Sequence, residues 1–68
     1  MKNNLAIVRA EVGWTQKQLA KAANLDSTMI AHYESGRRSP SLENALRIVA
    51  AFQKNYACVF VEDIWEIG

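Results

Sequence analysis

The sequence predicts an all-α fold in which five short helices pack into one small domain spanning residues 1–68. Three observations support this fold class. Apolar residues recur at helical spacing through most of the chain, and Asn, Thr, Asp and Ser residues that favour helix starts precede these stretches. Gly13 and Gly36 lie where two of the helices would end.

The length and composition limit what else the chain can contain. With 68 residues and a mass of 7.6 kDa it has no room for a separate effector domain. The single cysteine, Cys58, excludes an internal disulfide, and together with the single histidine, His32, it cannot build a four-ligand zinc site. We therefore expect no metal and no cofactor, and stability must come from helix packing and self-association.

The formal net charge is only +1, but the charge is unevenly distributed. Residues 1–38 carry a net charge of +3 and residues 39–68 carry −2. This distribution favours an orientation in which one basic face of the molecule meets a polyanion. The alternative interpretation is ordinary scatter of charges. The N-terminus lacks a secretory signal, and the longest apolar stretch, residues 56–61, is too short to span a membrane. An unpaired thiol suits a reducing compartment, so we expect a cytoplasmic protein without a membrane partner.

The first two helices have clear start signals. Leu5 to Val12 has helical spacing, with Asn3 or Asn4 as its cap and Gly13 as its left-handed end. Thr15 followed by Gln18 is a capping box, and Trp14 with Leu19 forms the hydrophobic staple that accompanies it. The second helix therefore begins at Gln16 and continues through Ala23.

The third and fourth helices follow two short connections. Asn24 tolerates a positive φ and suits a tight turn, after which Asp26 or Ser27 caps a helix of about residues 27–35. Ser41 caps a fourth helix from Leu42 to about Lys54. We expect its buried stripe to consist of Leu42, Ala45, Leu46, Val49 and Phe52.

The tail is ambiguous. By periodicity alone residues 55–61 fit a loop, a strand or an extension of the fourth helix, and residues 62–65 look like one or two final helical turns.

Residues 16–35 form two short helices joined by a tight turn. Ala20 is small enough to let a second helix approach closely, and Leu25 and Ile30 are apolar where both helices face a common core. This is the pattern of a helix-turn-helix unit, in which the second helix presents its outer side to the DNA major groove.

At this point the chain resembles a known family, the Cro/C1-type (XRE-type) helix-turn-helix repressors, whose domain is the compact five-helix fold called lambda-repressor-like. The matching residues are Arg9, Trp14-Thr15-Gln16, Leu19-Ala20, Ile30-x-x-Tyr33-Glu34-x-Gly36, Ser39-Pro40-Ser41-Leu42 and Val61-Glu-Asp-Ile-Trp65. The sequence departs from the family pattern in two places. Asn24 stands where the family usually has Gly, and the connection between Phe52 and Val61 is longer and more apolar than usual.

The resemblance implies which residues contact double-stranded DNA. Ser27, Thr28 and His32 occupy base-contacting positions, and at 100° per residue they also lie on the outer face of the third helix. Each alone could be an ordinary solvated residue.

The predicted backbone contacts are Gln16, Lys17, Arg37 and Arg38. The first two lie in the first turn of the second helix, where free amides favour phosphate, although Gln16 could instead only support the cap. The two arginines lie in a loop that the family places along the DNA backbone. The resemblance assigns Arg9 and Glu34 to a structural ion pair outside the DNA site.

The tail predicts a dimerisation segment, residues 56–68. Tyr56, Val59, Phe60, Ile64 and Trp65 add more apolar surface than so small a monomer easily covers, although some of them must complete the chain's own core. Cys58 is expected to be a small buried residue rather than a redox sensor.

These features favour a sequence-specific transcriptional regulator, a repressor or autoregulator that binds an inverted repeat as a homodimer. The alternative is an antitoxin-like module whose main contact is another protein partner. An enzyme is not expected, because the sequence has no recognisable catalytic set of residues and no glycine-rich phosphate loop.

Overall fold

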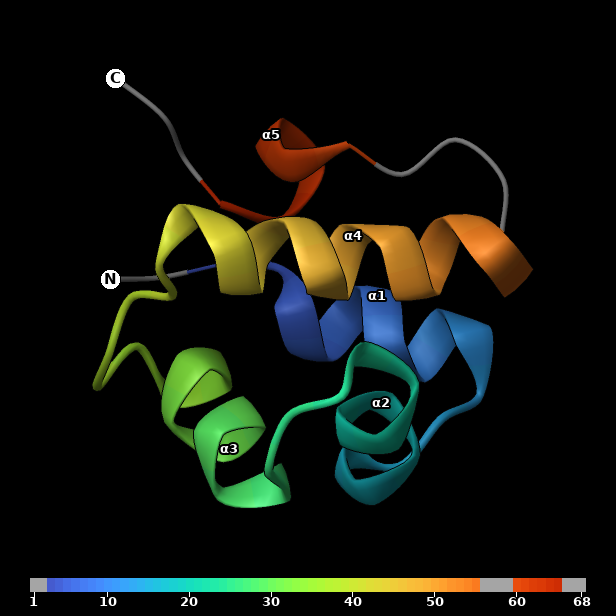
Figure 1. Ribbon diagram of the computed structural model, residues 1–68, viewed down its shortest axis with the longest axis horizontal. Helices are drawn as coiled ribbons and strands as arrows, with labels where there is room; N and C mark the ends of the chain where they lie inside the picture. The colour runs from blue at the N-terminus through green and yellow to red at the C-terminus, as the bar shows by residue number, and fades with distance from the viewer. Residues whose placement is uncertain (1–2, 56–59, 66–68) are drawn as a thin grey trace.

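The computed structural model describes residues 3–55 and 60–65, which form helices and an isolated β-bridge but no strand. The helices are, in chain order, α1 (Leu5–Val12), α2 (Gln16–Ala23), α3 (Ser27–Ser35), α4 (Leu42–Asn55) and α5 (Val61–Ile64). The predicted all-α fold is therefore confirmed (Figure 1). Within these ranges no helix combines the length and the apolar character that crossing a bilayer requires.

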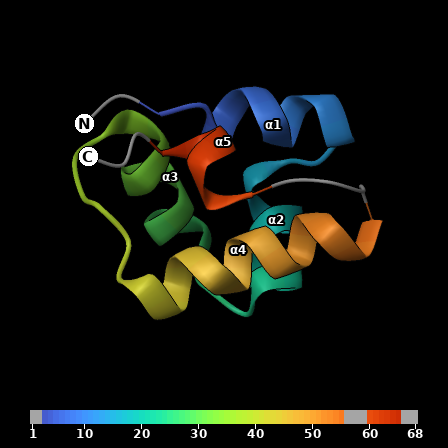
Figure 2. The same cartoon turned by 90° about the horizontal axis from the view of Figure 1, so that it is seen from above.

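The helices are arranged around α4, the longest of them. Figure 1 shows α2 and α3 on one side of α4 and α5 on the other. Figure 2, turned by 90°, shows that α5 lies between α1 and α4. The core inside this arrangement is formed by buried apolar side chains, of which the largest fully buried ones are Phe52, Leu5, Leu19, Ile30, Ile48 and Ile64.

The start of α2 has the predicted capping box. The Gln18 backbone N–H donates to Thr15 Oγ1 at 3.1 Å, and the Thr15 backbone N–H donates to Gln18 Oε1 at 2.8 Å. Trp14 packs against the core and stacks on Phe52 with 5.8 Å between ring centroids. The cap and the aromatic contact together determine where α2 begins and how the chain enters it.

The turn between α2 and α3 depends on Asn24. Its φ of 58° and ψ of 47° lie in the left-handed region, as predicted. The backbone N–H of Leu25 donates to the Ala20 carbonyl at 2.8 Å, which closes the end of α2 in a Schellman motif. Leu25 packs against the core, so the turn reverses the chain while keeping both helices on one apolar surface.

The buried face of α4 differs from the predicted stripe. Ala45, Val49 and Phe52 are buried as expected, but Leu42 is 73% exposed and Leu46 is 50% exposed. Ile48 is buried instead. At about 100° per residue, Leu46 lies about 100° around the helix from Ala45, at the edge of the buried sector. Apolar periodicity alone could not distinguish the core-facing residues from a second apolar strip beside them.

Both ends of the described chain meet at α5. Asn3 and Trp65 form an isolated antiparallel β-bridge, and the Asn4 backbone N–H donates to the Ile64 carbonyl at 2.8 Å. Asp63 caps its own helix by accepting the Phe60 backbone N–H at 2.8 Å. Of the ambiguous residues 55–61, Asn55 ends α4, Phe60 precedes α5 and Val61 begins it, whereas residues 56–59 lie outside the described ranges.

Candidate nucleic-acid interface

Helix α3 presents a polar surface opposite its core-facing residues. Ile30 is fully buried and Tyr33 is 4% exposed, which sets the rotation of the helix. Thr28 is then exposed, and Ser27 and His32 are partly exposed. Because Thr28 and His32 are four residues apart, they lie one turn apart on the same face. Their hydroxyl and imidazole groups can donate to or accept from base edges.

The start of α2 supplies donors suited to an anion. Gln16 and Lys17 lie in the first turn of α2, where a helix offers no carbonyl acceptor to the backbone N–H groups. The positive end of the helix dipole lies at the same place. The Lys17 side chain is exposed and adds a positive charge. A phosphate oxygen at this helix end would meet backbone donors and a cation together.

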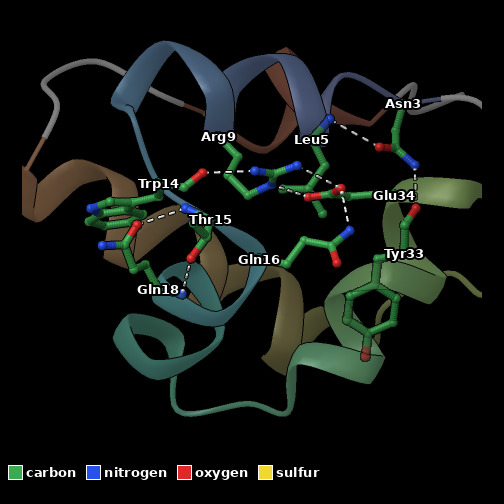
Figure 3. Close-up of polar contacts among 9 residues, drawn as sticks. All are labelled: Asn3, Leu5, Arg9, Trp14, Thr15, Gln16, Gln18, Tyr33 and Glu34. Atoms are coloured by element: carbon green, nitrogen blue, oxygen red, sulfur yellow. Dashed lines mark hydrogen bonds and ion pairs between the residues drawn. The ribbon is translucent and has the colours of Figure 1, made fainter.

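The Gln16 side chain is not free. Its Nε2 donates to Glu34 Oε1 at 3.0 Å, as Figure 3 shows. The Gln16 side chain therefore does not cap α2. The Gln18 side chain does so, by accepting the Thr15 backbone N–H. The Gln16–Glu34 bond brings the start of α2 beside the last turn of α3, close in the chain to His32 and to the loop that begins at Arg37.

Glu34 accepts hydrogen bonds from Arg9 as well. Arg9 Nε donates to Glu34 Oε2 at 2.5 Å and Nη2 donates to Oε1 at 3.2 Å, while Nη1 donates to the Trp14 carbonyl at 2.7 Å. The exposed fractions of the Arg9 and Glu34 side chains are only 19% and 8%. This ion pair joins α1 to α3, in keeping with the structural role that the family resemblance implied.

The Glu34 hydrogen bond raises the pKa of the Arg9 guanidinium above its ordinary value, with a smaller opposing effect of burial and a further coulombic contribution from Glu34. When folding raises the pKa of a group, that group stabilises the folded state fully at pH values below its pKa in the unfolded chain. This stabilisation is lost only when the pH rises through its pKa in the folded chain. Arg9 therefore stays charged, and its contribution stays constant, throughout the neutral range.

The predicted basic loop follows α3 directly. Gly36 ends the helix with a φ of 78°, and Arg37 and Arg38 are both exposed. The Arg38 backbone N–H donates to the His32 carbonyl at 3.3 Å, so the loop folds back onto the end of α3. The backbone of the basic loop is thereby placed next to the C-terminal end of that helix.

The structure separates the predicted dimer residues into three groups. Ile64 and Trp65 are 1% and 5% exposed and complete the core of their own chain. Phe60 is 57% exposed. Tyr56 and Val59 lie outside the described residues, as does Cys58.

Sequence reasoning missed several contacts that hold α3 in place. Asn3 Nδ2 donates to the Tyr33 carbonyl at 2.7 Å, while Asn3 Oδ1 accepts the Leu5 backbone N–H at 3.0 Å. Asn44 Nδ2 donates to the Tyr33 hydroxyl at 3.0 Å. These bonds link α3 to the N-terminal segment and to α4. The Asn3–Tyr33 and Asn44–Tyr33 bonds have no local sequence signal, because each joins separate elements of the fold, whereas the Asn3–Leu5 bond belongs to the helix start that the sequence predicted for Asn3 or Asn4.

Within the described ranges, no three His, Cys, Asp or Glu side chains gather closely enough to hold a metal ion. The polar face, the helix N-terminus and the basic loop instead form a surface suited to a polyanion.

These features together define a helix-turn-helix domain. A family model described as "Helix-turn-helix" matches residues 5–57, which is more than half of the chain. The chain therefore belongs to the XRE-type helix-turn-helix family. This is a family of DNA-binding regulators and not a family of enzymes.

Curated relatives carry names in keeping with this family. Two proteins of Archaeoglobus fulgidus, each named "Uncharacterized HTH-type transcriptional regulator", are 30% and 31% identical over 97% and 96% of this chain and 97% of their own lengths. The regulator YgzD of Bacillus subtilis is 35% identical over 88% of this chain and 91% of its own length. No solved structure matched the chain. The chain is thus a DNA-binding transcriptional regulator.

Proposed function

We propose that two copies of this chain bind an inverted-repeat operator and that occupancy represses transcription, including that of the chain's own gene. In each copy, Ser27, Thr28 and His32 contact base edges. Gln16, Lys17, Arg37 and Arg38 contact phosphates on either side. Such a protein acts in the cytoplasm, where operator DNA is accessible.

One observation carries this proposal. The Gln16–Glu34 hydrogen bond joins the start of α2 to the end of α3, so that phosphate donors and the polar face of α3 belong to one rigid unit. Phosphate contacts position a protein on the duplex, whereas base-edge contacts give sequence preference. A unit that holds both in fixed relation supports sequence-specific reading. A homodimer is part of the proposal because a two-fold protein matches an inverted repeat, with recognition helices about 34 Å apart.

The test begins with selection of bound duplexes from a random pool, which should yield an inverted repeat. Binding to that duplex and to a scrambled one is then measured for the wild type and for Thr28→Ala/His32→Ala. We expect the variant to keep its affinity for scrambled DNA and lose most of its preference for the operator, since each good base contact contributes about 1–3 kcal/mol of discrimination.

The matched control is Glu11→Ala/Lys54→Ala, which removes two exposed side chains from α1 and α4 without changing the net charge. It should retain the preference. An unchanged preference in Thr28→Ala/His32→Ala, or the absence of any selected sequence, would refute the assignment of α3 as the reading helix.

A further inference from the structure

The outer face of α3 carries no side chain of the types that bind one base through two hydrogen bonds. In the major groove, Arg or Lys recognises guanine in this way, and Asn or Gln recognises adenine. The nine residues of α3, in the order Ser-Thr-Met-Ile-Ala-His-Tyr-Glu-Ser, include none of these four residue types. The base reading that the proposed function assigns to α3 must therefore use other contacts.

Two polar side chains near the end of α3 are held by the protein itself. A glutamate can accept from the exocyclic amine of cytosine. The Glu34 carboxylate, however, binds Arg9 and Gln16, and its side chain is only 8% exposed (Figure 3). The Ser35 hydroxyl donates to the His32 carbonyl at 3.1 Å. Glu34 is thereby withdrawn from base contact, and Ser35 has no donor left for a base.

The core takes the large apolar side chains of α3. Ile30 and Tyr33 are buried, and the partly buried Met29 packs against the core. On a helix with about 100° per residue, the remaining residues lie within an arc of about 140° on the opposite side. All of them are exposed or partly exposed: Ser27, Thr28, Ala31 and His32.

Two of these four residues present methyl groups. Among the bases, only thymine carries a methyl group in the major groove, and the side chains of Thr and Ala are suited to contact it. Thr28 and Ala31 are three residues apart, so their Cβ atoms are neighbours on the helix surface, about 5–6 Å apart. Together they form a small apolar area in the middle of the outer face.

The other two residues offer single hydrogen bonds. The ring nitrogens of His32 diverge, so the imidazole cannot bind two adjacent atoms of one base edge. Its N–H donor suits N7, an acceptor that guanine and adenine share. The Ser27 hydroxyl can donate or accept and therefore contacts any base. These two side chains distinguish a purine from a pyrimidine but not one purine from the other.

We infer that α3 reads its operator chiefly through thymine methyl groups, with Thr28 and Ala31 as specificity-determining residues, and that His32 donates to a purine N7. This rests on the DNA reading of the proposed function and names the kind of half-site that α3 takes. The half-site has thymines facing Thr28 and Ala31 and a purine facing His32. Ala31 thereby joins the base-contacting residues that the sequence predicted.

The first test removes single methyl groups from the DNA. In the operator obtained by selection, each thymine is replaced in turn by deoxyuridine, which lacks only the 5-methyl group, and the affinity of the full chain is measured. We expect a loss of about fourfold at one or two thymines of each half-site, because one methyl group loses its apolar contact. Deoxyuridine at the other thymines should have no effect.

A double-mutant cycle then assigns the methyl contact to Thr28. Thr28→Ser removes only Cγ2 and keeps the hydroxyl, so the deoxyuridine effect at the thymine facing Thr28 should disappear. Thr15→Ser is the matched control. It removes the same methyl group from an exposed threonine outside α3 and keeps the oxygen that caps α2, so the fourfold effect should persist.

The N7 contact has its own cycle. Replacing the purines of the half-site in turn with their 7-deaza analogues should weaken binding of the wild type at one position. The same replacement should leave the affinity of His32→Ala unchanged, since that variant has already lost the donor. A 7-deaza effect of equal size in both proteins would refute the role of His32.

The outcomes separate this inference from the proposed function. If an inverted repeat is selected but deoxyuridine is tolerated at every thymine, methyl reading is wrong although the proposed function stands. The same holds if the selected half-site contains no thymine. A deoxyuridine effect that Thr28→Ser leaves unchanged at every position would overturn the assignment of Thr28. If no duplex is preferred over random DNA, the proposed function fails, and this inference with it.

Discussion

Gln16 Nε2 donates to Glu34 Oε1 at 3.0 Å, which ties the first residue of α2 to the penultimate residue of α3. A carboxylate only accepts hydrogen bonds, so the Gln16 amide must direct its nitrogen towards Glu34. One N–H of that amide and the Gln16 backbone N–H remain for a phosphate. The same carboxylate holds Arg9, so α1, α2 and α3 share one polar junction.

The Arg9–Glu34 pair should be strongly coupled. We expect Glu34→Ala to lower the free energy of unfolding by about 2–3 kcal/mol, since it leaves a largely buried guanidinium without its partner. Arg9→Ala should lower the free energy of unfolding by a similar amount. The double variant should lower it by clearly less than the sum of the two single losses. Urea denaturation measures all three.

The control for this cycle is the Glu43–Arg47 pair on α4. It has an N–O distance of 3.1 Å, but its side chains are 74% and 41% exposed. Its coupling energy should be only about 0.3–0.5 kcal/mol. Equal coupling in the two cycles would show that burial does not strengthen the Arg9–Glu34 pair.

The capping box makes Thr15 a determinant of stability. Thr15→Ala removes the acceptor of the Gln18 backbone N–H and should cost about 1 kcal/mol. Thr28→Ala is the same substitution at an exposed position of α3 and should change the free energy of unfolding by less than about 0.5 kcal/mol. Thermal denaturation distinguishes them, and equal losses would contradict the capping role.

Asn24 should tolerate glycine better than alanine. Its φ of 58° is costly for a residue with a Cβ and without a short polar side chain. We expect Asn24→Ala to lower the free energy of unfolding by about 1 kcal/mol and Asn24→Gly to change it by less than about 0.5 kcal/mol. A stable Asn24→Ala variant would mean that the turn had rearranged.

Arg37 and Arg38 should act through phosphates rather than bases. Replacing either with alanine should weaken binding to operator and scrambled duplexes to a similar extent. It should also reduce the slope of log affinity against log salt by about 1. Lys54→Ala removes an exposed charge at the end of α4 and should leave the slope unchanged. A loss of affinity confined to the operator would indicate base contact instead.

Trp65 should accept phenylalanine but not alanine. Its side chain is in the core, yet its buried Nε1 has no hydrogen-bond partner among the residues that the structure describes. Trp65→Phe loses apolar contact but also removes an unsatisfied N–H, so the net change should be less than about 1 kcal/mol. Trp65→Ala should cost about 3–5 kcal/mol. Equal losses in chemical denaturation would show that the N–H has an acceptor in solution.

Much of the candidate site was predictable because its signals are local. The Thr15–Gln18 box, the left-handed turn at Asn24 and the outward position of Thr28 and His32 depend on neighbours within a few residues. A helical period and a cap suffice to place them. The hydrogen bond between Gln16 and Glu34 was not predictable in this way, since the two residues are distant in the sequence and only the packing of α3 brings Glu34 within reach.

The sequence by itself determined the first three helices with their boundaries and the helix-turn-helix unit, because hydrogen bonds and dihedral preferences near each helix end select them, whereas it left residues 55–61 open. The tertiary structure alone decided which apolar residues are buried. It placed Ile48 in the core and left Leu42 and Leu46 exposed, and it buried Ile64 and Trp65 by pairing the tail with Asn3 and Asn4. Burial depends on how distant segments meet, and apolar character is the same whether a side chain faces its own core or a second copy.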